Sequence, residues 1–214
     1  EMSSLKTLTY NLDDKHFSNI VNLFKGEKIY SVSCKNKKAD IYFKIKQIYQ
    51  DGRINFCVRT PWGRFSSSPK LHTGYNIYNL LLSLPYYSSM TSDCSGFFSA
   101  VEEMTLPVGR LQKVGKENIY IDFAHTPDAL EAVCSELMKK NHKGLKLIFG
   151  AGGGRDKGKR ELMGNIAQKY AKKIYITSDN PRFEKPNEII EMIAAGISDK
   201  NKMIIESDRS EAIK

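Results

Sequence analysis

The second half of the chain alternates short apolar segments with longer amphipathic ones, and this alternation limits the possible folds more than any other feature. Strands are predicted at 118–123, 145–150, 173–178 and 202–206, and helices at 127–140, 158–171, 186–198 and from about 210 onward. Strongly apolar segments such as 145–149 are typical of parallel strands that are covered on both faces. With right-handed crossovers, the pattern predicts a doubly wound α/β domain with a mostly parallel sheet.

The first hundred residues follow a different pattern, which is rich in β-branched and aromatic residues. Strands are predicted at 28–34, 39–49 and 53–60. The Asp51-Gly52 pair between the last two is a hairpin signal. Together these segments predict a β-meander.

Helical spacing of apolar residues follows the meander and predicts a helix at 74–84 that ends before Pro85. A second helix is predicted at 94–104. Proline and glycine near residue 106 interrupt any helix, so we place a domain boundary there. The predicted domains are residues 1–106 and 107–214.

The composition is that of a globular and basic protein. The length of 214 residues is enough for two small domains, and 41% hydrophobic residues exclude a wholly disordered chain. Lys and Arg number 33 against 24 Asp and Glu, and the resulting charge of +9 would suit nucleic acid, anionic lipid or phosphorylated small molecules. The densest basic runs, 35–38 and 157–160, lie in a mixed background and are interpreted as compositional drift rather than as a nucleic-acid face. We therefore expect no nucleic-acid partner.

Targeting and metal signals are weak. No apolar run is long enough to span a bilayer, and no basic-then-apolar leader opens the sequence. The cysteines and histidines are too widely spaced for a local metal clamp. From these features we expect a cytoplasmic chain that inserts into no membrane and holds no metal through its own residues.

Three unusual loops follow predicted strands of the second domain. They are Asp122-Phe-Ala-His125-Thr-Pro-Asp128, Gly150-Ala-Gly-Gly-Gly-Arg155-Asp156-Lys-Gly-Lys159-Arg160 and Ser178-Asp179-Asn180-Pro181-Arg182. Ligands of open α/β sheets bind outside the carboxyl ends of the strands, so we expect the loops to converge on one edge. The glycine-rich loop lacks the Ser or Thr of a P-loop and the last glycine of a dinucleotide fingerprint. Alone it predicts either an anion at a helix N-terminus or a tight turn.

The polar residues of these loops each have a functional and a structural interpretation. Arg155 and Arg182, with the amide of Asn180, would form a fork for a carboxylate. The alternative for the segment around Asn180 is an ordinary turn with a solvated arginine. His125 and Asp122 have structural alternatives as a capping histidine and a hydrogen-bonded turn acid. The residues alone leave these alternatives open.

Four motifs of the second half occur together. They are Gly109-Arg110, Asp122-Phe-Ala-His125-Thr-Pro-Asp-Ala-Leu130, Gly150-Ala-Gly-Gly-Gly-Arg-Asp-Lys-Gly-Lys-Arg160 with Leu162-Met-Gly164, and Asp179-Asn-Pro-Arg182. The combination resembles the carboxy-terminal domain of the Mur ligases, the amide ligases of peptidoglycan synthesis. Upstream, Asn11-Leu-Asp-Asp14 and Gly74-Tyr-Asn76-Ile-Tyr-Asn79 resemble, more loosely, the end of their central domain. The resemblance implies a Rossmann-like domain preceded by part of an α/β ATPase domain.

The resemblance also implies a reaction, in which ATP drives addition of meso-diaminopimelate to UDP-MurNAc-L-Ala-D-Glu through an acyl phosphate. The ATP-binding residues that it implies are Asn76 and Asn79 at the adenine, Arg110 at the phosphates, Asp122 at the ribose, and His125 in the same loop. The diaminopimelate-binding residues that it implies are Arg155, Asp179, Asn180 and Arg182. Magnesium ligands are expected mainly outside this sequence, and no residue here is assigned as catalytic.

Several features separate this chain from a complete enzyme of that family. The 214 residues contain no P-loop, no UDP-sugar domain and no Gly-Lys-Gly-His-Glu motif. We therefore expect a piece of a longer, monomeric protein, inactive by itself. Gly154 replaces the acid usual in the family, Glu161 its proline and Phe123 its tyrosine. The alternatives are a sibling ligase that adds L-lysine or another amino acid, and a non-catalytic protein that binds an anion or nucleotide.

Overall fold

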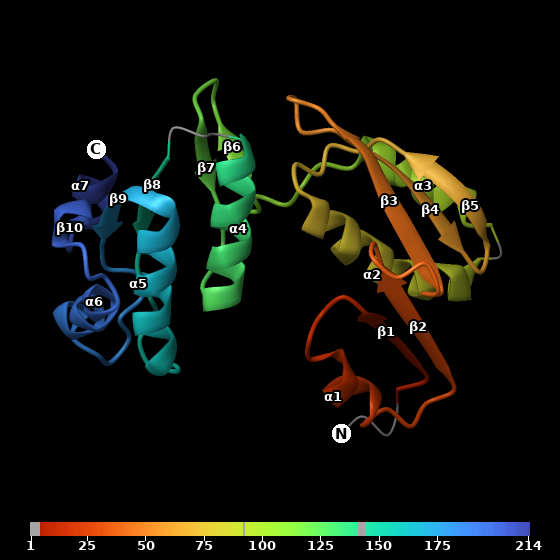
Figure 1. Ribbon diagram of the computed structural model, residues 1–214, viewed down its shortest axis with the longest axis horizontal. Coiled ribbons are helices and arrows are strands. Elements are labelled where there is room, and N and C mark those ends of the chain that lie inside the picture. The colour runs from red at the N-terminus through yellow and green to blue at the C-terminus, as the bar shows by residue number, and fades with distance from the viewer. Residues whose placement is uncertain (1–4, 92, 141–143) are drawn as a thin grey trace. The chain divides into compact units, whose positions relative to one another are not determined.

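The structure is a computed structural model that describes residues 5–91, 93–140 and 144–214. The chain divides into two compact units, Glu1–Val108 and Gly109–Lys214. In Figure 1 the first unit runs from red to yellow-green and the second from green to blue. Each unit has its own hydrophobic core.

The first unit is built around a five-stranded sheet of order β1-β2-β3-β4-β5 (Figure 1). Its strands are β1 (Thr7–Asn11), β2 (Lys28–Ser33), β3 (Ile41–Ile48), β4 (Ile54–Thr60) and β5 (Gly63–Ser67). Its helices are α1 (Phe17–Val21), α2 (Gly74–Met90) and α3 (Ser95–Glu103). The core joins Phe43 and Phe56 of the sheet to Leu81 of α2 and Phe98 of α3, all buried. The two longer helices are therefore held by apolar packing against the sheet.

The predicted β-meander is correct for β3 and β4 and wrong for β2. β3 and β4 are antiparallel, and Gly52 takes a positive φ of 90° in the turn between them. β2 instead pairs in parallel with β3, through only Val32↔Ile41 and Ser33↔Tyr42. Only the end of β2 is paired with the start of β3, so the short connection between them does not have to return along the length of a strand. A full crossover, which parallel pairs usually require, is unnecessary.

The predicted end of the first long helix is also wrong. α2 continues through Pro85 to Met90. Proline in a helix interior removes one backbone hydrogen bond and crowds the preceding turn. Pro85 is itself buried, next in sequence to the fully buried Leu84. Burial of this apolar face compensates for the lost hydrogen bond, so the helix is not interrupted.

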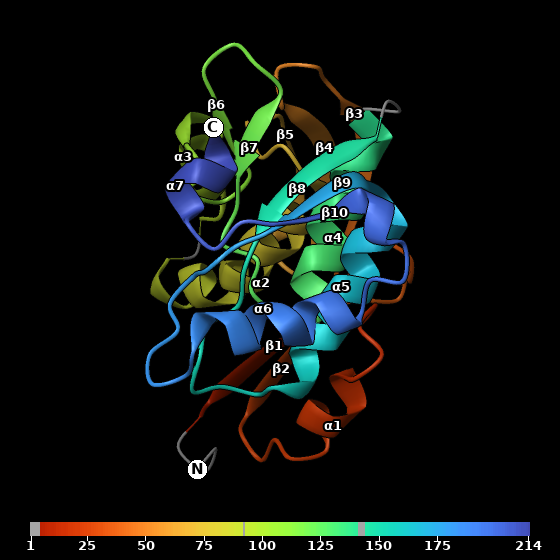
Figure 2. The same ribbon diagram turned by 90° about the vertical axis from the view of Figure 1, so that its left-hand side faces the viewer.

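The second unit contains a three-stranded parallel sheet of order β10-β9-β8, whose strands lie side by side in Figure 2. The strands are β8 (Leu145–Phe149), β9 (Ala171–Ile176) and β10 (Met203–Ile205). The helices are α4 (Pro127–Lys140), α5 (Gly158–Tyr170), α6 (Pro186–Ala195) and α7 (Arg209–Ile213), with a 3-10 turn η1 (Lys200–Lys202). α5 lies between α4 and α6. Met163 of α5 and Ile193 of α6 are buried with Ile174 of β9 in one apolar cluster.

The strand predicted at 118–123 exists but belongs to a separate hairpin. β7 (Ile119–Ile121) pairs antiparallel with β6 (Gln112–Val114) in a two-stranded sheet. The sequence pattern predicts β7 as a strand of the parallel sheet, because it predicts no strand at the position of β6. A partner a few residues away in sequence closes a much shorter loop than a distant strand, which favours the hairpin. Among the described residues, no helix is both long and apolar enough to cross a membrane.

Candidate functional site

Two loops of the second unit leave the parallel sheet at the same edge. β8 and β9 are adjacent, with Phe149 opposite Ile176 near their carboxyl ends. The glycine-rich loop, residues 150–157, leads from β8 into α5, and the Asp-Asn-Pro-Arg loop, residues 177–185, leads from β9 into α6. This is the edge at which open α/β sheets bind their ligands.

Hydrogen bonds join the two loops directly. The Gly153 amide donates to the Asn180 carbonyl oxygen at 2.8 Å, and Arg182 Nη1 donates to the Gly153 carbonyl oxygen at 2.8 Å. One position further on, the Gly154 amide donates to Glu184 Oε1 at 2.6 Å. The structure thus brings Arg155, which follows Gly154, close to the loop that carries Asn180 and Arg182.

Two glycines make this close approach possible. A Cβ atom at Gly153 would overlap the carbonyl oxygen of Pro181 on the facing loop. Gly154 has a positive φ of 62°, which most other residues adopt only at a cost. A Cβ atom there would lie 3.4 Å from Arg182 Cδ on the facing loop. Glycine at positions 153 and 154 therefore permits the close approach of the loops.

A buried ion pair lies beneath the loops. Arg160 in the first turn of α5 is fully buried, and its Nη1 and Nη2 each lie 2.8 Å from a different carboxylate oxygen of Glu184. The hydrogen bond from Arg160, reinforced by the Gly154 amide, lowers the pKa of Glu184 to about 2. The basic run 157–160 enters α5, and its last residue, Arg160, turns its side chain inward.

The charged side chains above this pair face solvent. Arg155, Asn180 and Arg182 are exposed. Arg182 has a positive φ of 50° in a turn that the Glu184 amide closes by donating to the Pro181 carbonyl oxygen at 2.9 Å. Two exposed guanidinium groups on joined loops are suited to bind a carboxylate.

Asp179 is also exposed and lies at the same edge. One of its carboxylate oxygens is 3.8 Å from Arg209 Nη1, and Arg209 also donates to the Ser178 carbonyl oxygen at 3.2 Å. An exposed pair at this distance contributes little to stability. The Asp179 carboxylate is therefore available to a ligand that carries an ammonium group.

The third loop, residues 122–128, follows the β6–β7 hairpin. Asp122 is half-buried and accepts the Leu111 amide and the Ala124 amide, each at 2.8 Å. The hydrogen-bonded turn acid suggested as its structural alternative is therefore present. Although β7 lies outside the parallel sheet, Lys159 Nζ donates to the His125 carbonyl oxygen at 2.9 Å, which joins this loop to the start of α5.

Aromatic contacts order the side chains of this third loop. The Arg110 guanidinium carbon lies 5.3 Å from the centre of the Phe123 ring, a cation–π contact. The His125 ring meets the same phenyl ring edge-on at 5.6 Å between ring centres. Phe123 and His125 are both exposed, as is Arg110. A cation and two aromatic rings thus form an exposed group beside Asp122.

Asn76 and Asn79 belong to α2 of the first unit. Asn76 is buried, where its Nδ2 donates to the Leu71 carbonyl oxygen at 2.8 Å and its Oδ1 accepts from Asn79 Nδ2 at 3.4 Å. Asn79 is exposed. Asn76 therefore stabilises the start of α2, and Asn79 presents its amide to solvent. The structure describes each unit by itself, so it brings these two residues into no common site with the loops of the second unit.

The described residues contain no cluster of side chains that could form a magnesium site. In residues 5–91, 93–140 and 144–214, no three Asp, Glu, His or Cys side chains gather as metal ligands would. These residues therefore do not fit a complete magnesium site.

The residues that the sequence analysis missed are Arg160 as a buried partner and Glu184 as its counter-ion. Glu184 comes two residues after Arg182 and precedes the Lys185-Pro186 start of α6. Nothing in its spacing distinguishes it from a solvated acid. One weak signal for the burial of Arg160 was available. Arg160 lies at helical spacing from Met163 and Ala167, which are buried on the same face of α5.

The fold and the joined loops define an α/β domain with a parallel sheet that carries two exposed arginines, Arg155 and Arg182, on loops at its carboxyl edge. Residues 109–214 match the family described as "Mur ligase, glutamate ligase domain". The chain belongs to the Mur ligase family.

Relatives named "UDP-N-acetylmuramoyl-L-alanyl-D-glutamate--2,6-diaminopimelate ligase" match nearly the whole chain. The one from Buchnera aphidicola subsp. Schizaphis graminum is 34% identical over 98% of this chain and 44% of its own length. The one from Aquifex aeolicus is 36% identical over 98% of this chain and 42% of its own length. The chain thus spans less than half the length of these relatives.

Solved structures match in the same way. A structure of UDP-N-acetylmuramoyl-L-alanyl-D-glutamate--2,6-diaminopimelate ligase is 31% identical, with a TM-score of 0.54 over 97% of this chain and 44% of its own. A MurF structure from Acinetobacter baumannii is 16% identical, with a TM-score of 0.71 over 97% of this chain and 44% of its own. At that identity the second match supports the fold alone.

Proposed function

We propose that this chain forms part of a cytoplasmic, monomeric ligase that uses ATP to join meso-diaminopimelate to UDP-MurNAc-L-Ala-D-Glu in peptidoglycan synthesis. Residues 1–106 would be the end of its central ATP-binding domain, and residues 107–214 would belong to its carboxy-terminal domain. The observation that carries the proposal is the joined pair of loops with exposed Arg155 and Arg182. The names of the relatives across nearly the whole chain support it.

In this proposal the joined loops hold the amino-acid substrate. Diaminopimelate has an amine that reacts and, at its far end, a carboxylate beside an ammonium group. Arg155, Arg182 and the Asn180 amide would bind that carboxylate, and Asp179 would face the ammonium. Lysine ends in an ammonium alone, which two guanidinium groups would repel. Holding the far end fixes where the reactive amine lies, which is how such loops lower the barrier to amide formation.

The nucleotide would be held by the remaining candidate residues. A carboxylate has about four acceptor positions, and Asp122 uses two of them for backbone amides, so ribose hydroxyl groups can still donate to it. Arg110 and His125 are exposed beside it, and Arg110 would face the phosphates. Asn79, whose amide faces solvent, would be nearer the adenine than the buried Asn76.

The overall reaction needs parts that the described residues do not supply. The γ-phosphoryl group of ATP would move to a carboxylate oxygen of the D-glutamate residue, and ADP would leave. The amine would then attack the acyl carbon, so that the C–N bond forms, the C–O bond breaks, phosphate leaves and the nitrogen gives up a proton. Bound magnesium would neutralise charge on the phosphates. Because the 214 residues contain no P-loop, we expect this chain alone to release no ADP.

The test is amino-acid-dependent ADP release by the full-length protein that contains this chain, with UDP-MurNAc-L-Ala-D-Glu as acceptor. We expect turnover with meso-diaminopimelate and little with L-lysine. Arg182→Lys keeps the charge but loses the planar fork, and should raise the KM for diaminopimelate about 10-fold or more. Equal use of L-lysine would indicate a sibling ligase. Absence of ADP release, with anion binding that weakens steeply with salt, would indicate a binding protein.

A further inference from the structure

Arg160 occupies a position that is unfavourable for a cation. Its side chain is 0% exposed, and it is the third residue of α5. Burial removes the water that stabilises its charge, and the first turn of a helix carries the positive end of the helix dipole. Its Nε atom is buried and has no hydrogen-bond partner among the described residues. An apolar side chain here would cost less, so stability does not explain an arginine at this position.

The carboxylate of Glu184 binds both the buried Arg160 guanidinium and the backbone of the glycine-rich loop. Glu184 Oε1 accepts both Arg160 Nη2 and the Gly154 amide, at 2.8 Å and 2.6 Å. Oε2 accepts Arg160 Nη1 at 2.8 Å, and Lys157 Nζ lies 3.5 Å from the same oxygen. Arg160 Nη2 also reaches the Gly152 carbonyl oxygen at 3.3 Å. The Glu184 carboxylate of the Asp-Asn-Pro-Arg loop is thus bound to the backbone of the glycine-rich loop and to helix α5.

These contacts lie directly behind the two exposed arginines. Gly154 immediately precedes Arg155, and Glu184 is two residues after Arg182. A guanidinium fork recognises a carboxylate only when its position and plane are fixed, and displacements of about 1 Å at such a site cost much of the binding. Arg155 is exposed, and Arg182 is held by a hydrogen bond to the Gly153 carbonyl oxygen of the facing loop, so the position of that loop decides where its guanidinium lies. The geometry of Arg155 relative to Arg182 therefore depends on how the loops are joined.

We propose that Arg160 and Glu184 are positioning residues, whose ion pair fixes the two loops so that Arg155 and Arg182 face one carboxylate of the amino-acid substrate. The inference rests on the proposed function. Neither residue touches the substrate. Their removal should therefore act on the binding of the amino acid and leave the binding of ATP unchanged.

The test separates positioning from stability. The double variant R160M/E184L replaces the ion pair by apolar side chains, and E184Q is the conservative single variant. The matched control is E131Q, which removes a carboxylate that binds Lys169 and Tyr170 and joins α4 to α5 away from the loops. The melting temperature and the exchange rates of the Gly153 and Gly154 amides are measured on the chain itself. The KM values for meso-diaminopimelate and ATP are measured on the full-length protein.

We expect the double variant to melt at or above the wild-type temperature. Its Gly153 amide, whose acceptor is the Asn180 carbonyl oxygen, should exchange about 10-fold faster or more. Its KM for diaminopimelate should rise about 10-fold or more while the KM for ATP changes less than about twofold. E184Q should shift the amide exchange and the KM in the same directions. E131Q should change neither the exchange at Gly153 nor the KM for diaminopimelate.

Two results would overturn the inference. Unchanged Gly153 exchange in both Glu184 variants would show that the ion pair does not hold the loops, because the Gly153 amide keeps its acceptor, the Asn180 carbonyl oxygen. Faster exchange with an unchanged KM for diaminopimelate would show that the loops need not be fixed for binding. If Arg182→Lys still raises that KM, the proposed function survives either result. If Arg182→Lys has no effect, the site assignment itself is wrong, and the inference falls with it.

Discussion

At the scale of single residues, neighbouring glycines of the same loop have different surroundings. A Cβ atom at Gly153 would overlap the Pro181 carbonyl oxygen, whereas one at Gly152 would lie 3.7 Å from its nearest neighbour, an ordinary contact. Gly153→Ala should therefore lower the free energy of unfolding by about 1–3 kcal/mol, because the loops must separate. Gly152→Ala should change it by less than about 0.5 kcal/mol. Urea denaturation of the two variants measures the difference, and equal effects would contradict the close approach.

Glu184 makes stability depend on pH at this same site. Its folded pKa is lowered from 4.5 to about 2, mainly by Arg160. A carboxyl whose pKa is lower in the folded state stabilises the protein above its unfolded pKa, and this contribution is lost as pH falls through the folded pKa. The free energy of unfolding should therefore decrease between pH 4.5 and about pH 2. Denaturation across this range should show a smaller decrease for E184Q, and parallel curves would contradict the assignment.

The elements show where sequence patterns suffice and where they do not. The predicted helices at 158–171 and 186–198 correspond to α5 and α6, because their apolar faces are regular and their ends carry glycine or proline. The strand β7 is predicted, but the hairpin is not, because its partner β6 is only three residues long. α2 passes Pro85 because packing in the core outweighs a local preference. Strand pairing and helix ends that depend on contacts with other parts of the chain could not be predicted from the local sequence pattern.

Part of the candidate site also follows from the sequence pattern, and part of it does not. Strand order places the glycine-rich loop and the Asp-Asn-Pro-Arg loop at one edge, so their approach follows from the βαβ pattern. The burial of Arg160 does not follow from it. A lysine- and arginine-rich run is usually solvated, and only the packing of α5 against its neighbours determines which side chain turns inward.

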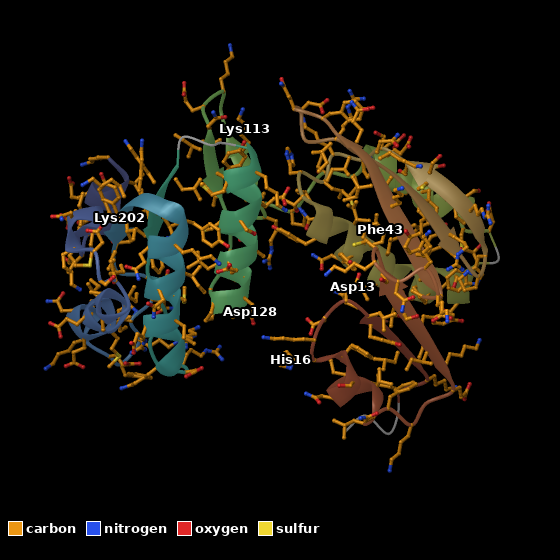
Figure 3. The ribbon with its side chains drawn as sticks, in the orientation of Figure 1. Asp13, His16, Phe43, Lys113, Asp128 and Lys202 are labelled. Carbon is orange, nitrogen blue, oxygen red and sulfur yellow. The ribbon has the colours of Figure 1, made fainter. Side chains whose placement is uncertain are left out.

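The contact of helix α2 with the sheet gives a prediction at the scale of elements. The Tyr78 hydroxyl donates to Asp13, on the turn after β1, where Asp13 is labelled in Figure 3. Asp13 also accepts Ser33 Oγ at 2.8 Å and the Cys34 amide at 2.9 Å at the end of β2. Tyr78→Phe should lower the free energy of unfolding by about 1.5–3 kcal/mol, because the carboxylate loses a donor.

The control for this prediction is Tyr86→Phe on the same helix, because Tyr86 is 71% exposed. It removes the same hydroxyl group from a solvated position and should change stability by less than about 0.5 kcal/mol. Thermal or urea denaturation compares the two. Equal effects would mean that the hydrogen bond to Asp13 does not join α2 to the sheet.

At the scale of the whole molecule, the chain consists of two units with separate cores and a short junction. Val108 at the junction is 87% exposed, and Gly109 has a positive φ of 76°. Limited proteolysis should therefore cut first near residue 108 and leave two protease-resistant fragments. Mass spectrometry of the early products identifies the cut. A first cut within α2 or α5 would contradict the division.

In the proposed function, the joined loops bind the far carboxylate of an amino acid. The most direct measurement is a titration of meso-diaminopimelate into the isotope-labelled chain, followed through the backbone amides of Gly153, Gly154 and Asn180. We expect saturable shifts at these amides that L-lysine does not produce and that Arg182→Lys weakens. Absence of shifts at high diaminopimelate concentration, or equal shifts with L-lysine, would contradict it.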